Sequence, residues 1–423
     1  MDAKIRIHTK RLLIFKYRLQ KIMAIQELTF TDLADKISAA SHKDDADAGK
    51  YHEGIIKSYK FSKPLKEPSV LTAVNIANGL GLDDLKYLFG MDLGEFIYPD
   101  KLSVKILLIN LYRSLNIEEI SVKTDFVLGE VVVKAEDKYF EDFFQKVDLD
   151  EDLETNLPNL LSIVLDYRQE KTNTRIDIEQ LNSKINNDEF YKQIKTTQHY
   201  DLEVYFPVLW EIILDNLPEN IGIKPPLNKT APSINDDNDN VIRDADILAK
   251  LPQQLNGSLA AIGLTDKELL SYVPIKKKTL ANYLNGREGD NVNPGINTLI
   301  DLACALDVTP EYLLGLDNKH SFPILQTLES KLINLFHALK NARFKIRENH
   351  GKKVAYTKNQ YVYRFFDNRS KIKSIHDAYK IISEEIDSKK LCVMNGEIVE
   401  YDDRINNDLA AEIRFKLRNN LYD

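Results

Sequence analysis

The sequence predicts a mainly α-helical protein of several domains, with two helical bundles and further mixed segments that include a β-hairpin. Three observations lead to this prediction. The chain has 423 residues, which is too long for one ordinary core. Apolar residues recur at helical spacing along much of it. A Pro-rich and then Asn/Asp-rich stretch at 223–240 divides it into nearly equal halves, and a similar apolar pattern occurs in both.

The composition is that of a folded protein in a reducing compartment. Hydrophobic residues make up 43% and charged residues 29% of the chain. Two cysteines exclude a disulfide framework and a Cys-rich zinc site. The first residues show no secretory signal, and no stretch approaches the ~20 apolar residues of a membrane span. We therefore expect a cytoplasmic protein with no membrane segment, no metal site and no cofactor.

Charge is distributed unevenly around the formal net charge of −8. Residues 1–66 hold 14 Lys and Arg against 8 Asp and Glu, and residues 318–423 hold 20 against 14. Residues 99–223 hold only 13 against 25. Local positive potential is enough for a polyanionic partner, so the acidic total does not exclude one.

The first half predicts helices in order from its start. A basic segment, 4–21, contains a first helix whose buried side would be Leu12, Leu13, Phe15, Leu19 and Ile22. A second helix begins after Thr29 and carries Leu33, Ala34 and Ile37. An insertion, SAASHKDDADAG, then precedes a probable helix around Tyr51–Tyr59. The string LTAVNIANGLGLDDLKYLFG at 71–90 predicts two more.

The middle of the chain predicts helices at 101–116, 157–168 and 202–217, each with an apolar stripe. The β-branched run Phe126–Val133 predicts a strand. The clustered acids at 148–154 look like a solvated turn.

The second half repeats the first pattern more clearly. Thr265 and Glu268 predict a capping box for a helix that Pro274 ends. A short helix, Lys276 to Leu284, follows, with Leu280 and Leu284 facing inward. Asn285-Gly286 is a typical helix stop. Helices at 296–306 and after Thr309-Pro310 complete the pattern.

The last part predicts an amphipathic helix at 323–342, a hairpin at 390–401 around Asn395-Gly396, and a final helix at 404–421.

The second-half pattern resembles the Cro/CI-type (XRE) helix-turn-helix family of phage and mobile-element repressors. The matching strings are GLTDKELLSYVPIKKKTLANYLNG at 263–286 and NPGINTLIDLACALDVTPEYLLG at 293–315. Asp266 departs from the family, which commonly has Gln there. The first half is a fainter copy of the same pattern. The resemblance implies two five-helix bundles, each with a helix pair whose second member enters the major groove of duplex DNA.

The resemblance assigns DNA contact to the helix that precedes Asn285. Lys can donate to guanine, Asn can pair with adenine, and the Thr methyl can pack on thymine. Three lysines at a helix start oppose the helix dipole, and a polyanion beside them would offset that cost. The candidate DNA-binding residues of this unit are Thr265 (as the cap), Lys276, Lys277, Lys278, Thr279, Asn282 and Arg287.

Three other basic regions leave alternatives open. In the first half the corresponding candidates are Lys57, Ser58 and Lys60, on a unit that either binds DNA or is a degenerate bundle. The segment 4–21 either holds a DNA backbone or is an ordinary amphipathic helix. The segment 340–373 interleaves cations with aromatic residues, which suits either a nucleic-acid surface or a protein core.

These patterns predict five segments. They are a degenerate helix-turn-helix domain at 1–98, an acidic association or sensing domain at 99–222, a linker at 223–244, a helix-turn-helix DNA-binding domain at 245–317, and a basic α+β domain at 318–423.

We expect a transcriptional regulator, a repressor, whose partner is double-stranded DNA. It would act either as a homodimer or as an intrachain pseudo-dimer. The sequence contains no phosphate-binding glycine loop, nucleophile elbow or paired-acid motif, so we expect no enzyme. Two other functions stay open. One is a protein-interaction module or repressor inhibitor that uses the acidic region 99–222. The other is an accessory factor that holds DNA without regulating a promoter.

Overall fold

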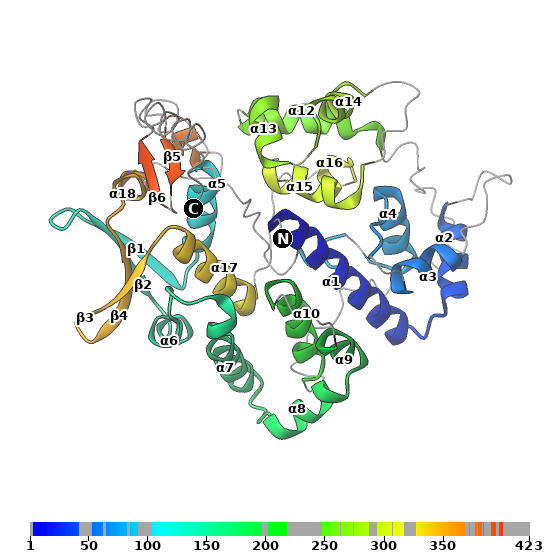
Figure 1. The fold of residues 1–423 in the computed structure, drawn as a ribbon, viewed down its shortest axis with the longest axis horizontal. Coiled ribbons are helices and arrows are strands. Elements are labelled where there is room, and N and C mark those ends of the chain that lie inside the picture. Colours follow the sequence, from blue (N-terminus) through cyan, green and yellow to red (C-terminus); the bar gives the residue numbers. More distant parts are fainter. Residues whose placement is uncertain are drawn as a thin grey trace, which may run out of the picture. The chain divides into compact units, whose positions relative to one another are not determined.

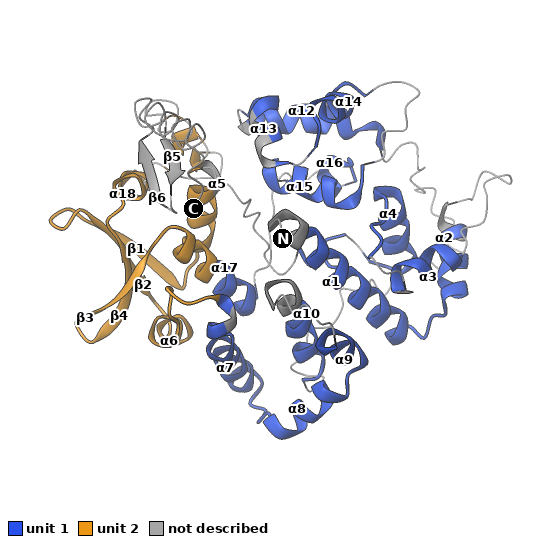
Figure 2. Cartoon of the chain, viewed as in Figure 1, with its two compact units in different colours: residues 1–100, 153–334 blue, residues 101–152, 335–423 orange. Residues whose placement is uncertain are grey.

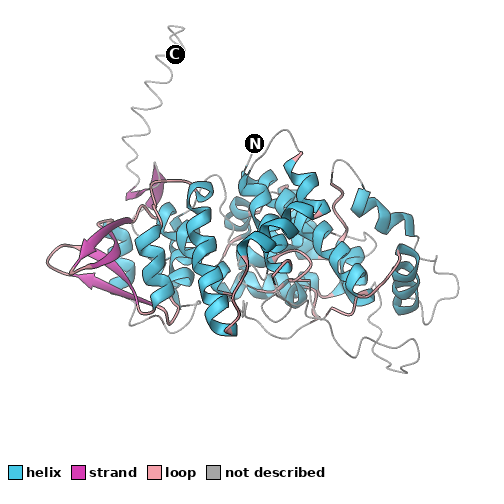
Figure 3. Ribbon diagram, turned by 90° about the horizontal axis from the view of Figure 1, so that it is seen from below, coloured by secondary structure: helices cyan, strands magenta, loops and turns pink. Residues whose placement is uncertain are grey.

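The computed structural model contains two compact units, residues 1–100 with 153–334 and residues 101–152 with 335–423 (Figure 2). It describes residues 3–41, 53–61, 65–82, 85–91, 104–196, 202–217, 248–262, 264–273, 275–286, 294–306, 308–316, 327–368, 372, 377–378, 380–382, 384, 391–394 and 397–400. Helices dominate the described residues, and the strands all belong to the second unit (Figure 3). The predicted mainly helical fold class is therefore confirmed.

Unit 1 begins with a group of four helices and a tight turn. They are α1 (Ala3–Ile25), α2 (Phe30–Ser41), α3 (Glu53–Phe61), α4 (Val70–Gly79) and the turn at 85–91 (Figure 1). Thr29 and Asp32 form a reciprocal cap at the start of α2. The Thr29 hydroxyl accepts from the Asp32 amide at 3.1 Å, and the Asp32 carboxylate accepts from the Thr29 amide at 2.8 Å. The Ser69 hydroxyl caps α4 by accepting from the Thr72 amide.

A second helical group in unit 1 has five helices. They are α12 (Leu251–Ile262), α13 (Asp266–Tyr272), α14 (Lys277–Asn285), α15 (Ile296–Leu306) and α16 (Pro310–Leu313). Thr309 caps α16 and Pro310 occupies its first turn, as the sequence predicts. The two groups share one hydrophobic core, which runs from Phe15 to Met91 and from Leu251 to Leu314.

The remaining helices of unit 1 follow the second unit's first segment along the chain. They are α7 (Leu153–Thr172), α8 (Ile178–Asn187), α9 (Glu189–Lys195) and α10 (Leu202–Asp215). Asp177 and Asp188 cap α8 and α9 through their carboxylates. Helix α10 packs along α1, and its Trp210 is buried.

Unit 2 is built on a four-stranded antiparallel sheet of order β1-β2-β4-β3. The strands are β1 (Ile120–Asp125), β2 (Glu130–Ala135), β3 (Lys345–Asn349) and β4 (Lys352–Thr357). Val131, Val132 and Val133 of β2 pair with Thr357, Tyr356 and Ala355 of β4. The sheet therefore joins two chain segments that lie far apart in the sequence.

Helices α5 (Val104–Leu115), α6 (Lys138–Lys146) and α18 (Gln360–Asp367) contact this sheet. Helix α17 (Leu328–Asn341) begins in unit 1 and ends in unit 2. Strands β5 (Leu391–Met394) and β6 (Glu397–Glu400) form an antiparallel pair in which Met394 faces Glu397. This pairing confirms the hairpin predicted at 390–401.

The strand predicted at Phe126–Val133 is wrong in its first half. The chain turns at 126–129, between β1 and β2, where Phe126 is 81% and Val127 93% exposed. The Asp125 carboxylate accepts from the amides of Val127 and Leu128 at 2.9 and 3.0 Å and so holds the turn. A β-branched run alone does not reveal this side-chain cap.

The unit boundaries differ from the predicted segments 99–222 and 318–423. Each of these segments contributes residues to both units, because β2 pairs with β4 and α10 packs on α1. The predicted helices at 101–116, 157–168, 202–217 and 323–342 correspond to α5, α7, α10 and α17. The helix at 404–421 and the whole linker at 223–244 lie outside the described residues.

Candidate nucleic-acid interface

Helices α13 and α14 form a closely connected pair. The Ile275 amide donates to the Val273 carbonyl at 2.9 Å within the short link between them. Leu269 and Val273 on one side of the link and Leu280 and Tyr283 on the other are buried. Leu284, which the sequence placed inward, is only partly buried, and Tyr283 takes the inner position instead. Since α14 buries one side, its opposite side faces outward.

The start of α14 presents three consecutive cations. Lys276, Lys277 and Lys278 are all exposed, and their ammonium groups make no hydrogen bond or ion pair with the described residues. Lys276 is the N-cap residue and supplies no side-chain cap. Free backbone amides and three ammonium groups therefore gather at the positive end of one helix, where an anion would be stabilised.

The far end of α14 is fixed to α12. The Asn256 side-chain amide donates to the Leu284 carbonyl at 2.9 Å. Gly286 ends the helix with φ of 52°, in the left-handed region, as predicted for the Asn285-Gly286 stop. A β-carbon at Gly286 would lie 2.8 Å from Pro252 Cγ. The helix is thus held at its C-terminal end while its lysine-bearing end is open.

The other predicted residues of this unit lie near the same helix. Thr279 and Asn282 are half-buried on α14. Thr265 is exposed just before α13, and its carbonyl accepts from the Leu269 amide at 2.9 Å. The predicted cap partner Glu268 has no described side chain, and Arg287 lies outside the described residues.

The equivalent helix of the first group, α3, has a different polar surface. Lys57 forms an ion pair with Glu53 at 2.7 Å, and Thr31 donates to the same carboxylate at 2.7 Å. The hydrogen bonds from Lys57 and then Thr31 lower the pKa of Glu53. Ser58 donates to the Ile55 carbonyl at 2.6 Å, and Lys60 lies over the Phe30 ring. Each predicted residue of this face already has a partner within its own group.

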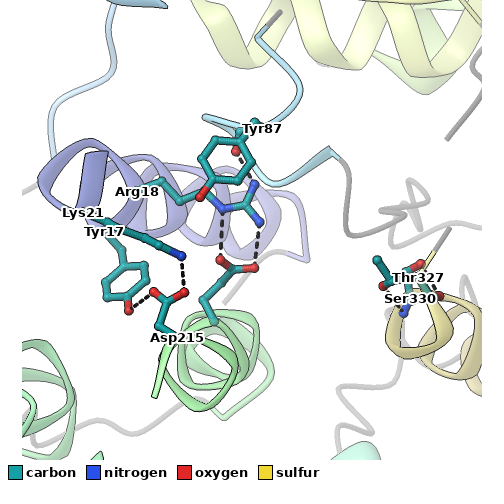
Figure 4. A network of polar contacts seen from close by, with 8 residues as sticks. Tyr17, Arg18, Lys21, Tyr87, Asp215, Thr327 and Ser330 are labelled. Carbon is teal, nitrogen blue, oxygen red and sulfur yellow. Dashed lines mark hydrogen bonds and ion pairs between the residues drawn. The ribbon is translucent and has the colours of Figure 1, made fainter. Parts of the chain in front are cut away.

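The basic segment 4–21 is an ordinary buried helix where its side chains are described. Arg18 is buried, pairs with Glu211 at 2.7 Å and lies over the Tyr87 ring (Figure 4). Lys21 and the Tyr17 hydroxyl both contact the Asp215 carboxylate. Burial and the neighbouring Asp215 raise the pKa of Tyr17, which keeps its hydroxyl a donor. Of the two alternatives for this segment, the structure supports the amphipathic helix.

Two acidic residues of the region 99–222 therefore form ion pairs within the chain. Glu211 and Asp215 of α10 neutralise cations of α1. Burial of Asp215 raises its pKa, with Lys21 and Tyr17 acting in the opposite direction. Both carboxylates therefore already have partners within unit 1.

In the basic segment 340–373, the described aromatic residues are mainly core. Phe344, Tyr361, Phe365 and Phe366 are buried in unit 2. Arg347 pairs with the buried Glu130 and lies over the Tyr356 ring. Hydrogen bonds to Glu130 raise the pKa of Arg347. Of the two interpretations of this segment, the structure favours the core.

The described residues contain no group of His, Cys, Asp and Glu side chains that could hold a metal ion. Nor does any described helix have the length and apolar character that crossing a membrane requires. No protein-family model, curated protein or solved structure matches the chain.

Proposed function

We propose that the chain is a sequence-specific DNA-binding transcriptional regulator that acts as a repressor, with α14 as the helix that enters the major groove. The observation that carries this proposal is the exposed row Lys276, Lys277 and Lys278 at the start of α14, whose ammonium groups have no partner among the described residues. The resemblance of 263–315 to Cro/CI-type helix-turn-helix repressors supports it, since that family reads DNA with the N-terminal residues of this helix.

The charge arrangement favours a polyanion over an idle solvated face. Like charges next to one another at the positive end of a helix dipole repel both one another and the dipole. Phosphate groups beside them would relieve that repulsion and release counterions from the duplex. Helix α3, at the equivalent place in the first group, shows the opposite arrangement, because Glu53 already holds Lys57.

The residues of α14 divide into roles. Lys277 and Lys278 reach guanine edges or phosphates, and Lys276 contacts the backbone. Thr279 and Asn282 are half-buried and lie further along the helix. The Thr279 methyl packs on a thymine methyl, and the Asn282 amide pairs with an adenine edge. Binding of this kind near a promoter would block RNA polymerase.

The test is a mobility-shift titration of the full chain with Lys277→Ala plus Lys278→Ala. DNA fragments would first be selected from the source genome by pull-down with the wild-type chain. We expect the double variant to bind at least about tenfold more weakly and to show a shallower dependence on salt. The log–log slope should fall by about one unit for each phosphate that the variant no longer neutralises.

The matched control is Lys123→Ala plus Lys345→Ala, which removes the same charge from exposed positions on β1 and β3. Circular dichroism would show that both variants keep the wild-type helical content. Equal affinities for the wild-type chain and the α14 variant would contradict the proposal. A selection that enriches no DNA would do so too.

A further inference from the structure

The two helical groups of unit 1 share several local features at equivalent positions. Helices α3 and α14 have nine residues each, and Tyr59 and Tyr283 occupy the same buried position in them. The Leu28 amide donates to the Met23 carbonyl at 2.8 Å, and the Leu264 amide donates to the Leu259 carbonyl at 3.0 Å. The same local hydrogen bond thus leads into α2 and into α13. We call the group at α1–α4 the first copy and the group at α12–α16 the second copy.

The copies meet at equivalent positions. Ser69, just before α4, and Gly295, just before α15, form an antiparallel bridge. The Val70 amide donates to the Pro294 carbonyl at 3.3 Å, and the Ile296 amide donates to the Pro68 carbonyl at 3.4 Å. A contact in which each residue meets its own counterpart is the signature of a two-fold axis. Here that axis lies inside one chain.

Buried polar contacts hold the copies together. Arg11 of the first copy pairs with the buried Asp301 of the second at 2.7 Å, and His8 Nε2 lies 2.8 Å from the same carboxylate. The Leu85 amide donates to Glu311 Oε1 at 2.7 Å. Together with the shared core, these contacts fix one relative arrangement of the two copies.

The contacts are complementary but not interchangeable. The first copy caps α4 with its own Ser69. The second copy has Gly295 at that position, and Glu67 of the first copy accepts from the Asn297 amide at 2.9 Å instead. A β-carbon at Gly295 would lie 2.6 Å from Glu67 Oε1. The glycine therefore makes room for a cap that comes from the other copy.

Two second copies would lack the charged cap of this interface. The position equivalent to Glu67 is Asn293, so a second copy offers a shorter and uncharged side chain in place of the capping carboxylate. The position equivalent to Asp301 is Asn75, so two first copies would face Arg11 with an amide. Pairing between unlike copies is therefore preferred over pairing between like copies.

The outward helices of the copies are also unequal. Helix α14 carries the exposed row Lys276–Lys278, which contacts no partner in the part of the chain that the structure describes, whereas α3 begins with Glu53, which Lys57 and Thr31 hold in place. A carboxylate at the start of the groove-facing helix repels phosphate.

From these observations we infer that one chain binds its DNA site alone, as an internal pseudo-dimer, and reads base edges with α14 only. The DNA partner is a non-palindromic duplex site with one specific half, and the first copy takes the place of a second subunit. This inference rests on the proposed function for its DNA part. The internal pairing of the copies does not depend on that function.

The experiment has a DNA-free arm and a DNA arm. Sedimentation equilibrium of the full chain alone, over the concentrations of the binding titration, should give the mass of one chain, 48.6 kDa. On a selected DNA fragment it should give one chain per duplex. A chain that dimerises in either arm would overturn the inference.

Base-pair substitution across the protected site then tests the single reading helix. Changes in one half should lower affinity by roughly 5- to 150-fold at the most sensitive positions, as for mismatches in specific sites. Changes in the other half should lower it by less than about 2-fold, as expected for contacts to the backbone alone. Two sensitive clusters related by a dyad would overturn the inference and leave the proposed function intact. If no DNA is bound, the proposed function and the DNA part of the inference both fall, and the DNA-free arm still tests whether the chain is a monomer.

Discussion

Buried charges in unit 1 are paired across long intervals of sequence. Arg18 meets Glu211, and Arg11 meets Asp301, at sequence separations of 193 and 290 residues. Removing one member of such a pair leaves the other charge buried without compensation. These residues contribute to stability through their partners.

Asp301 gives a prediction about pH. Burial alone would raise the pKa of Asp301, but Arg11 and His8 outweigh it and hold the pKa below its usual value. A carboxyl with a lowered folded-state pKa stabilises the protein above its unfolded-state pKa of about 3.9, and this stabilisation is lost as the pH falls through the folded-state value. We expect Asp301→Asn to destabilise unit 1 by about 3 kcal/mol at neutral pH. The difference from the wild-type chain should shrink below about pH 4.

Urea denaturation followed by the fluorescence of Trp210, the one tryptophan of the chain, would measure this effect. Asp166→Asn, at an exposed position on α7, is the matched control and should change little at any pH. A destabilisation by Asp301→Asn that stays constant from neutral pH to about pH 3 would contradict the assignment.

For single residues, the sequence predicted which lysines would be exposed on α14 but not which arginines would be buried. The exposure of Lys276–Lys278 follows from local helical spacing, since Leu280 and the residues near it fix the inner side. The burial of Arg11 and Arg18 depends on carboxylates that only the tertiary fold brings near. The basic composition of α1 therefore suggested a DNA-contacting arm as one alternative.

Helix ends in this protein are set by specific local contacts. Side-chain caps begin α2, α4, α8, α9, α16 and α18. All of these caps are Ser, Thr, Asp or Asn residues, the types that most favour this position. Of these helices, α2, α4 and α16 correspond to predicted ones, whereas α8, α9 and α18 were not predicted despite their caps. The turn at 126–129 was predicted as a strand because its cap lies in the preceding strand.

Gly286, at the C-terminal end of α14, gives a prediction about the stability of that helix. Its positive φ and the nearby Pro252 leave no room for a side chain. We expect Gly286→Ala to destabilise the end of α14 by about 1–2 kcal/mol, the cost of a left-handed residue with a β-carbon. Hydrogen exchange of the α14 amides would detect it as faster local opening.

Gly257→Ala in α12 is the matched control for this substitution. A β-carbon there meets nothing within 4 Å, so alanine should slow exchange in α12 or leave it unchanged. If Gly286→Ala leaves exchange in α14 unaltered, the conformation assigned to the end of this helix is incorrect.

Each of the two units is built from segments that are not contiguous in the sequence. Unit 2 takes residues 101–152 and 335–423, and unit 1 takes the rest. Local patterns predicted most of the helices in the two helical groups of unit 1. They did not reveal that β2 pairs with β4, because strand partners so distant leave no signal in a single sequence.

This pairing leads to a prediction for a truncated chain. Without residues 335–423, β1 and β2 would remain as an isolated two-stranded hairpin, which is marginally stable in water. We expect the amides of 120–135 to lose nearly all protection from hydrogen exchange in the fragment 1–334, while those of α4 and α15 stay protected. Retained protection at 120–135 would show that the hairpin folds without β4.

The distant pairing within the sheet also has a consequence for protein synthesis. Glu130 and Arg347, which are partners in unit 2, are 217 residues apart in the chain. At about 5–20 residues per second, a ribosome takes roughly 10 to 40 s to make that interval. Throughout this delay the edge of β2 that later pairs with β4 has no partner strand, and other nascent chains can associate with it. Chaperone binding during translation should therefore concentrate on β2, and should end once β4 has left the exit tunnel.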